Sequence, residues 1–266
     1  MPRKPTLSPT RINTYLECAV KYRYVYQDKL GRFYLRAKHQ FSFGSTLHHV
    51  LQDFHEQGAT QTPDEMVTAV QTQWISAGYT DEAQEREYKE TGTQIIQAYH
   101  EAHQQRVVAQ IETIATEKTI TCDLGNFKLS GRVDRIDRHE DGTLEIIDYK
   151  SGRWEVTSEQ IHDDLAMSCY QLILSELYPD SPIMATIYAL RSGTSATASL
   201  TKEELAEFRT DLLILAEEIL ERDYTELIPE PIEICPRCDF LRLCQRYWTS
   251  DQKAELFDET HSDEGL

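Results

Sequence analysis

The stretch GRVDRIDRHEDGTLEIIDYKSG, residues 131–152, decides the fold of this chain. Its two halves alternate or run β-branched and apolar, and Glu140, Asp141 and Gly142 supply a turn between them, which is the pattern of a β-hairpin. The preceding stretch ETIATEKTITCDL, residues 112–124, has the same β-type pattern. We therefore expect an antiparallel meander whose last strand ends at Lys150.

Charged residues continue the buried face of that last strand. Side chains alternate along a strand, so Asp148 and Lys150 share the apolar face and Tyr149 points away. Burying a carboxylate without a partner is costly, and a metal ion is one of the few partners that stabilises several acids together. Asp134 on the preceding strand is the natural second carboxylate. A surface hairpin with an Asp–Lys pair is the alternative if the tripeptide is taken alone.

Carboxylates and a lysine in this pattern suit phosphodiester hydrolysis. The reaction needs a nucleophilic water, neutralisation of charge on the phosphate oxygens and stabilisation of a leaving alkoxide. Mg²⁺ or Mn²⁺ held by oxygen ligands supplies all three. Lys150 would orient the water or help to deprotonate it, and would offset phosphate charge. Glu117 precedes the site on a predicted strand, where it is either a fourth acidic contributor or an exposed edge residue.

The rest of the chain alternates between helical and strand patterns. Ser8 and Pro9 suit a helix start, and the helix that follows carries Cys18 or breaks at it. Later elements are expected as helices near residues 44–55, within 63–110 and over 163–177, a strand over 182–190, and a long helix that Thr201 caps. We expect one domain over residues 1–250 and an acidic, mobile tail over residues 251–266.

Cysteines form a second pattern. The sequence places one near the start and three close together near the end: Cys18, Cys235, Cys238 and Cys244. Thiolates that short, proline-containing loops release from regular structure converge on one soft metal ion or cluster, and zinc and an iron–sulfur cluster both fit. The other two, Cys122 and Cys169, fit buried positions on a strand and a helix.

Charge and hydropathy narrow the class of protein. The formal charge of -18 argues against a broad nucleic-acid-binding surface, because phosphate contacts need Lys and Arg. Residues 1–40 nevertheless hold nine Lys and Arg against two acidic residues, which fits a narrow nucleic-acid track or a solvated face. The sequence shows no apolar run of membrane-spanning length and no apolar signal segment, so we expect a soluble, cytoplasmic chain without a membrane partner.

Taken together, the motifs resemble those of a known family. Asp134 followed by Asp148-x-Lys150 is similar to the signature of PD-(D/E)xK nucleases, and GRVDRID and IIDYKSG resemble the RecB-like exonuclease branch. The resemblance extends over nearly the whole chain, through LSPTRINTYLECAVKYRYVY, FGSTLHHVLQDF, YQLILSEL and the closing Cys-x2-Cys-x5-Cys.

The resemblance implies roles for further residues. His48 matches the metal-binding histidine of Gly-x3-His, and the helical pattern supports His48, which flanks the apolar stripe, over His49 on the opposite face. The carbonyl of Tyr149 is implied as a further metal ligand beside Asp134 and Asp148. Gln171 matches a glutamine that helps to place the nucleic acid or the catalytic lysine. The chain departs from the family at Ser175, where a tyrosine is usual.

The implied fold is an α/β restriction-endonuclease-like core with a mixed sheet flanked by helices, helical N-terminal additions and a C-terminal cysteine module. The implied cofactors are Mg²⁺ or Mn²⁺ and a [4Fe-4S] cluster on Cys18, Cys235, Cys238 and Cys244, as in the helicase–nuclease AddB and CRISPR-adaptation nucleases, with Zn²⁺ as the alternative at the cysteines. The cluster would act as a mechanical staple between the two ends of the chain.

The implied activity is that of a DNA exonuclease on single-stranded ends, in DNA repair, recombination or CRISPR adaptation. The sequence contains no Gly-x4-Gly-Lys-Ser/Thr loop, so any unwinding must come from a helicase partner, and an integrase is another expected partner. A different function stays open, that of a weakly catalytic or non-catalytic DNA-binding scaffold subunit of a helicase–nuclease or integration complex.

Overall fold

The computed structural model describes residues 4–106, 111–152 and 155–259, and the chain forms two compact units. The first unit comprises residues 1–9 and 37–214, and the second comprises residues 10–36 and 215–266. The single domain predicted for residues 1–250 stays a prediction. The predicted tail lies partly in a helix, α11 (Ser250–Glu259), and partly outside the described residues.

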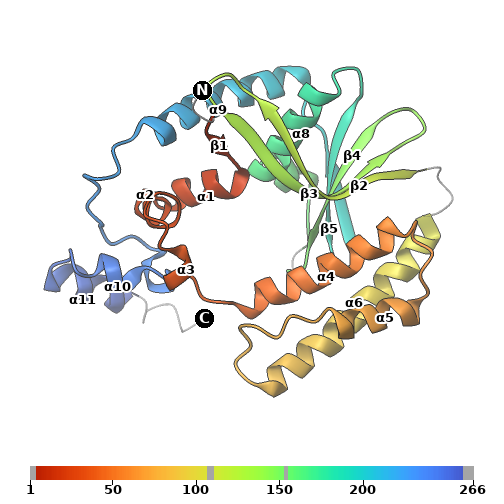
Figure 1. The fold of residues 1–266 in the computed structure, drawn as a ribbon, viewed down its shortest axis with the longest axis horizontal. Coiled ribbons are helices and arrows are strands. Elements are labelled where there is room, and N and C mark those ends of the chain that lie inside the picture. The colour runs from red at the N-terminus through yellow and green to blue at the C-terminus, as the bar shows by residue number, and fades with distance from the viewer. Residues whose placement is uncertain (1–3, 107–110, 153–154, 260–266) are drawn as a thin grey trace. The chain divides into compact units, whose positions relative to one another are not determined.

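The first unit is built around a six-stranded mixed sheet (Figure 1). Its strands are β1 (Thr6–Leu7), β2 (Glu112–Asp123), β3 (Lys128–Arg138), β4 (Leu144–Lys150), β5 (Ile183–Ala189) and β6 (Thr194–Ala198). The order is β1-β3-β4-β5-β6, and β2 also pairs with β3. Strands β2, β3 and β4 pair antiparallel, which confirms the predicted meander, whereas β4 and β5 pair in parallel.

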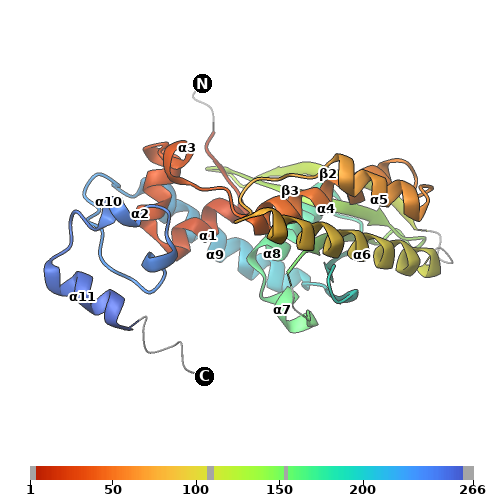
Figure 2. The same cartoon turned by 90° about the horizontal axis from the view of Figure 1, so that it is seen from below.

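Helices cover both faces of this sheet. The helices of the first unit are α4 (His39–Glu56), α5 (Pro63–Thr72), α6 (Glu82–Arg106), α7 (Ser158–His162) and α8 (Leu165–Leu177). The parallel pairing of β4 and β5 requires a crossover connection, and α7 and α8 provide it. Figures 1 and 2 show α4 and α6 running side by side on one side of the sheet, with α8 on the other.

The helix pattern follows from the spacing of apolar residues. On α4, the residues Phe43, Leu47, Val50, Leu51 and Phe54 are at most 1% exposed, because they recur every three or four positions and face the core. This core also takes in residues of α5, α6, β4 and β5, including Tyr149 and Tyr188. Helix α4 begins before the predicted Gly44, so Phe41 lies on it as well.

The second unit joins the two ends of the chain. Its elements are α1 (Pro9–Glu17), which begins at the last residue of the first unit, α2 (Ala19–Tyr22), a π-helical turn η1 (Arg23–Gln27), α3 (Gly31–Tyr34), the 3₁₀ turn η2 (Cys235–Arg237), α10 (Leu241–Cys244) and α11. Helix α9 (Lys202–Glu221) leads into this unit. Cys18 lies at the break between α1 and α2 in an extended conformation, with φ of -167°.

No helix in the described part of the chain is both long and apolar enough to cross a membrane. Both cysteines assigned to the core are buried as predicted, with Cys122 6% and Cys169 0% exposed.

Candidate active site

Strand pairing brings three acidic residues into one row across the sheet. Residues on either side of Glu117 in β2 pair with residues on either side of Asp134 in β3, so these two carboxylates are neighbours. In the β3–β4 pair, Arg135 lies opposite Ile147. The same register continued by one residue sets Asp134 opposite Asp148. The row therefore comes from three different strands and depends on their register.

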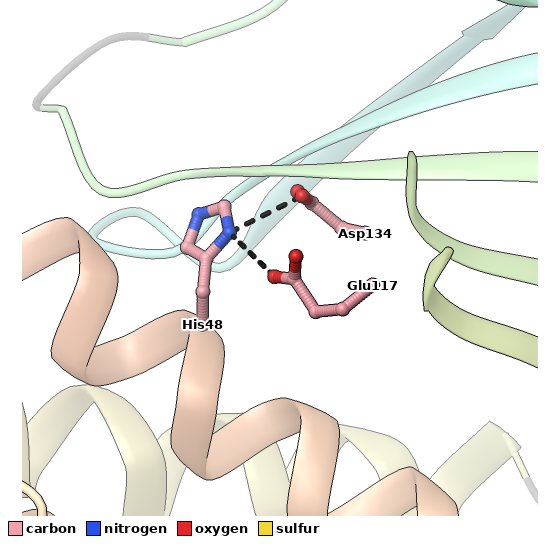
Figure 3. A group of neighbouring side chains, drawn as sticks. All are labelled: His48, Glu117 and Asp134. Carbon is pink, nitrogen blue, oxygen red and sulfur yellow. Dashed lines mark ion pairs between the residues drawn. The ribbon is translucent and has the colours of Figure 1, made fainter. Parts of the chain in front are cut away.

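His48 approaches this row from helix α4, as Figure 3 shows. Its Nδ1 lies 3.2 Å from Asp134 Oδ1 and 3.4 Å from Glu117 Oε1. Its Nε2 donates to the carbonyl oxygen of Tyr149 at 2.9 Å, and the Tyr149 N–H donates to Asp134 Oδ2 at 2.7 Å. One imidazole ring thus contacts two carboxylates and one backbone carbonyl, while His49 is exposed.

Electrostatics at His48 reflect this concentration of negative charge. Burial opposes a charged ring, but the hydrogen bonds to Asp134 and Glu117 outweigh it and raise the pKa of His48 to about 10. In the metal-free protein the imidazolium therefore supplies the cation that the carboxylates require. Metal binding would displace the proton on the nitrogen that faces them.

Asp148 and Lys150 form an ion pair beside the row. Lys150 Nζ lies 2.7 Å from Asp148 Oδ2, so the ammonium group is the partner of this buried carboxylate oxygen. Burial raises the pKa of Asp148, the Lys150 charge opposes this rise, and the neighbouring Asp134 adds to it. Burial alone would lower the pKa of Lys150, but Asp148 raises it overall, so Lys150 stays charged at neutral pH.

These residues fit a divalent cation. His48, Glu117 and Asp134 each offer one ligand atom, and the three atoms lie within 4.8 Å of one another. Octahedral ligands about 2.1 Å from an ion lie roughly 3 Å apart, close to the 3.2 Å between His48 Nδ1 and Asp134 Oδ1. The carboxylate of Asp148, which Lys150 holds beside the row, offers a further oxygen ligand. The donor set is mostly oxygen, which suits Mg²⁺ or Mn²⁺.

The sequence alone gave little reason to expect Glu117 among the residues of the site. The interpretation of Glu117 as an exposed edge residue is wrong, because only 9% of its side chain is exposed. Its φ is +43°, a left-handed conformation that is strained for a glutamate, and a register shift between Thr113 and Ala115 interrupts the same strand. Arg132 Nε lies 2.6 Å from Glu117 Oε2, so Glu117 bridges His48 and Arg132.

A close contact explains why the Gly-x3-His motif has a glycine at position 44. A Cβ on Gly44 would lie 3.1 Å from Ser151 Oγ, closer than most such contacts. Helix α4 therefore approaches the segment after β4 closely at this position. The close approach places His48, one helical turn further along, beside the Tyr149 carbonyl.

A buried polar network holds Tyr149 from the other side of its strand. Arg135 Nη1 donates to the hydroxyl oxygens of Tyr149 and Tyr99, both at 2.8 Å, and also contacts His55 Nε2. Its Nη2 pairs with Asp137 at 2.8 Å. The side chain of Tyr149 is thereby anchored, while its peptide group contacts His48 and Asp134.

The structure places the remaining predicted site residues as follows. Gln171 is 1% exposed, and its Oε1 accepts from the Leu200 N–H at 3.0 Å, while its Nε2 has no hydrogen-bond partner among the described residues. The Ser175 hydroxyl donates to the Leu172 carbonyl, so its hydrogen bond lies within α8. Tyr170 lies near the acidic residues: burial raises its pKa most, and Asp148 and Asp134 raise it further.

The four cysteines that the sequence groups lie in one unit and line one small cavity. Burial, followed by the neighbouring thiols of Cys238, Cys235 and Cys18, raises the pKa of Cys244 to about 12. Four soft donors around one space fit either a zinc ion or a cluster. The free space in this cavity is about 20 Å³, about one water in size.

The fold and the site together define a class of protein, nucleases whose acidic residues and lysine lie on adjacent strands of a mixed sheet. The model of the PD-(D/E)XK nuclease superfamily matches residues 6–245. The chain belongs to this family, and its fold is of the restriction-endonuclease-like α/β type.

A solved structure shares this fold at low sequence identity. A crystal structure of a protein named "Putative exonuclease" from Eubacterium rectale has a TM-score of 0.54 and 13% identity, and the match covers 98% of this chain and 94% of that one. The crystal structure of SSO0001 has a TM-score of 0.30 and 18% identity over 62% of this chain and 80% of that one, and it supports no conclusion. No curated protein matches the chain at a significant level.

Proposed function

We propose that this nuclease is a Mg²⁺- or Mn²⁺-dependent DNA exonuclease that acts on single-stranded ends. The observation that supports this most is the convergence of His48, Glu117 and Asp134 beside the Asp148–Lys150 pair. The nuclease family supports hydrolysis of nucleic acid, and one neighbour in structure bears the name "Putative exonuclease". DNA repair, recombination or CRISPR adaptation is the proposed setting, with a helicase or integrase partner.

The residues of the site have distinct proposed tasks. The bound metal would supply charge neutralisation and an acidified water. His48, Glu117, Asp134 and Asp148 would hold it, and the Tyr149 carbonyl would add a neutral ligand.

Lys150 is charged and held by Asp148, so it orients the attacking water and offsets phosphate charge instead of removing a proton. Gln171 is proposed to position this region from α8, because its buried Nε2 has no hydrogen-bond partner among the residues that the structure describes.

A cleavage assay tests the proposal. Linear and circular single-stranded DNA and linear duplex DNA are incubated with the protein in Mg²⁺, Mn²⁺ or EDTA. Metal-dependent loss of linear single strands, with circles intact, is the expected result. Asp148→Asn should abolish it, and Asp141→Asn on the same hairpin, an exposed residue, should not. DNA binding without metal-dependent degradation would instead favour the scaffold function.

We also propose that Cys18, Cys235, Cys238 and Cys244 hold a [4Fe-4S] cluster that joins the two ends of the chain, with zinc as the alternative. Anaerobically purified protein should absorb visible light, and metal analysis should find iron. Cys238→Ser should remove the colour and lower the melting temperature, whereas Cys122→Ser, the same change at a buried cysteine outside this group, should keep the colour. Colourless protein with one zinc per chain would establish the alternative.

A further inference from the structure

A pocket opens next to the candidate active site, within the first unit. Its volume is about 660 Å³, which lies in the range of small-molecule and nucleotide sites. The side chains of His48, Glu117 and Lys150 reach it from the catalytic side, and Phe41 and Arg191 are among the residues of its remaining wall. The first three belong to the proposed chemistry, whereas Phe41 and Arg191 have no task in it.

Phe41 is exposed on the same helix that carries His48. It is 70% exposed, whereas Phe43 and Phe54 on the same helix are at most 1% exposed. An isolated exposed apolar side chain needs no explanation. Phe41 differs because it lies seven residues before His48, so the two project from nearly the same side of α4, roughly 10 Å apart along the axis.

Small residues occupy the turn between these two positions. Gly44 and Ser45 lie three and four residues after Phe41, and both line the same pocket. The small side chains of Gly44 and Ser45 therefore leave room over the surface of α4 between the Phe41 ring and the metal-binding residues. A strand that has its phosphate at the metal could lie along this surface and reach Phe41 within about three nucleotides, at 3.4 Å or more for each.

Arg191 supplies the charge that such a strand requires. Its Nε donates to the Ser151 carbonyl at 3.0 Å, and its guanidinium lies 5.0 Å from the Phe43 ring centroid and 5.5 Å from that of Tyr88. It forms no ion pair with any residue in the described part of the chain. By contrast, Arg132 already forms an ion pair with Glu117, and Lys150 forms one with Asp148. Arg191 is thus a fixed positive group at this pocket, and no carboxylate among the described residues pairs with it.

We propose that this pocket is a nucleotide subsite, in which Phe41 stacks on an unpaired base near the scissile phosphate and Arg191 binds a neighbouring phosphate. Stacking on an aromatic ring needs a base whose face is free, which a paired and stacked duplex does not offer. The subsite would therefore select single strands. This inference rests on the proposed nuclease function, since it takes the metal site as the place of cleavage.

Binding measured without cleavage tests the subsite independently of catalysis. The probes are a fluorescein-labelled single-stranded 15-mer and the same strand with abasic nucleotides at either its 5′ or its 3′ end, titrated by anisotropy in EDTA. Phe41→Ala should weaken binding of the intact strand by about 5- to 150-fold, the equivalent of one stacked base. It should change binding of one abasic strand by less than about twofold, because no base is left to stack.

Matched variants separate stacking from other effects. Phe41→Trp should bind like the wild type, and Phe41→Leu should behave like Phe41→Ala, because leucine keeps apolar area without the ring. Tyr178→Ala, which removes an exposed aromatic residue that lines a different pocket, should leave binding unchanged. Arg191→Ala should weaken intact and abasic strands alike and lower the slope of log K against log salt by about one. Thermal melting confirms that each variant is folded.

The outcomes for the subsite and for the nuclease are distinguishable. Unchanged binding by Phe41→Ala, or an equal loss on intact strands and both abasic strands, overturns the subsite even if the wild type degrades DNA. The predicted pattern of binding together with no metal-dependent cleavage supports the subsite and overturns the proposed exonuclease.

Discussion

His55 offers a test of the buried network that anchors Tyr149. It is 6% exposed, and its Nε2 contacts the Tyr99 hydroxyl at 2.7 Å and Arg135 Nη1 at 2.5 Å. Burial lowers the pKa of His55 most, and the charges of Arg135 and His103 lower it further, to about 2. His55 is therefore a neutral acceptor in the folded protein. Its protonation would set a positive ring against a buried guanidinium.

The size of the effect follows from linkage. An unfolded histidine titrates near pH 6.5, so the unfolded state gains a proton below that pH and the folded state does not until about pH 2. The contribution of His55 to stability is fully present above pH 6.5 and is lost progressively as the pH falls. Between pH 7 and pH 5 the loss is about 2 kcal/mol, at 1.36 kcal/mol for each pH unit below 6.5.

The measurement compares the wild type with His55→Gln, whose amide oxygen can accept the same hydrogen bonds but takes up no proton. Urea unfolding followed by tryptophan fluorescence at pH 7, 6 and 5, in metal-free buffer, gives the free energy of unfolding of each protein. The wild type should lose about 2 kcal/mol more than His55→Gln between pH 7 and pH 5. A difference between the two proteins that stays constant with pH would refute the assignment of a neutral, buried His55.

Two further predictions test residues that hold the site in place. Tyr149→Phe removes the hydroxyl that accepts from Arg135, and should lower the free energy of unfolding by about 1–3 kcal/mol in urea titrations. Tyr79→Phe is its control, because the buried Tyr79 hydroxyl has no hydrogen-bond partner among the described residues, and no loss is expected. Gly44→Ala should lower metal-dependent cleavage at unchanged secondary structure, since the added methyl group meets Ser151 Oγ. Adding Ser151→Gly should restore cleavage, and no recovery would contradict the steric reason.

Long-range pairing limits what could be predicted about the site. The meander and the positions of Asp134 and Asp148 follow from a repeat of two residues, which the sequence displays locally. Strand β6 is short and mostly exposed, and it lacks such a signal. Glu117 could be suspected only from its place before the hairpin. Its inclusion depends on the irregular β2 backbone and on contacts with a helix about 70 residues earlier.

The sequence by itself determined the class of this protein, because short-range patterns carry it: alternation in the strands, the apolar stripe of α4, and the spacing of Asp148, Lys150 and the last three cysteines. Only the tertiary structure decided how His48 is oriented, that Glu117 joins Asp134, and that Phe41 and Arg191 border the same pocket as Lys150. These relations join residues that are far apart in the chain. They exist only after strand register and helix packing are fixed, and neither is encoded at any single position.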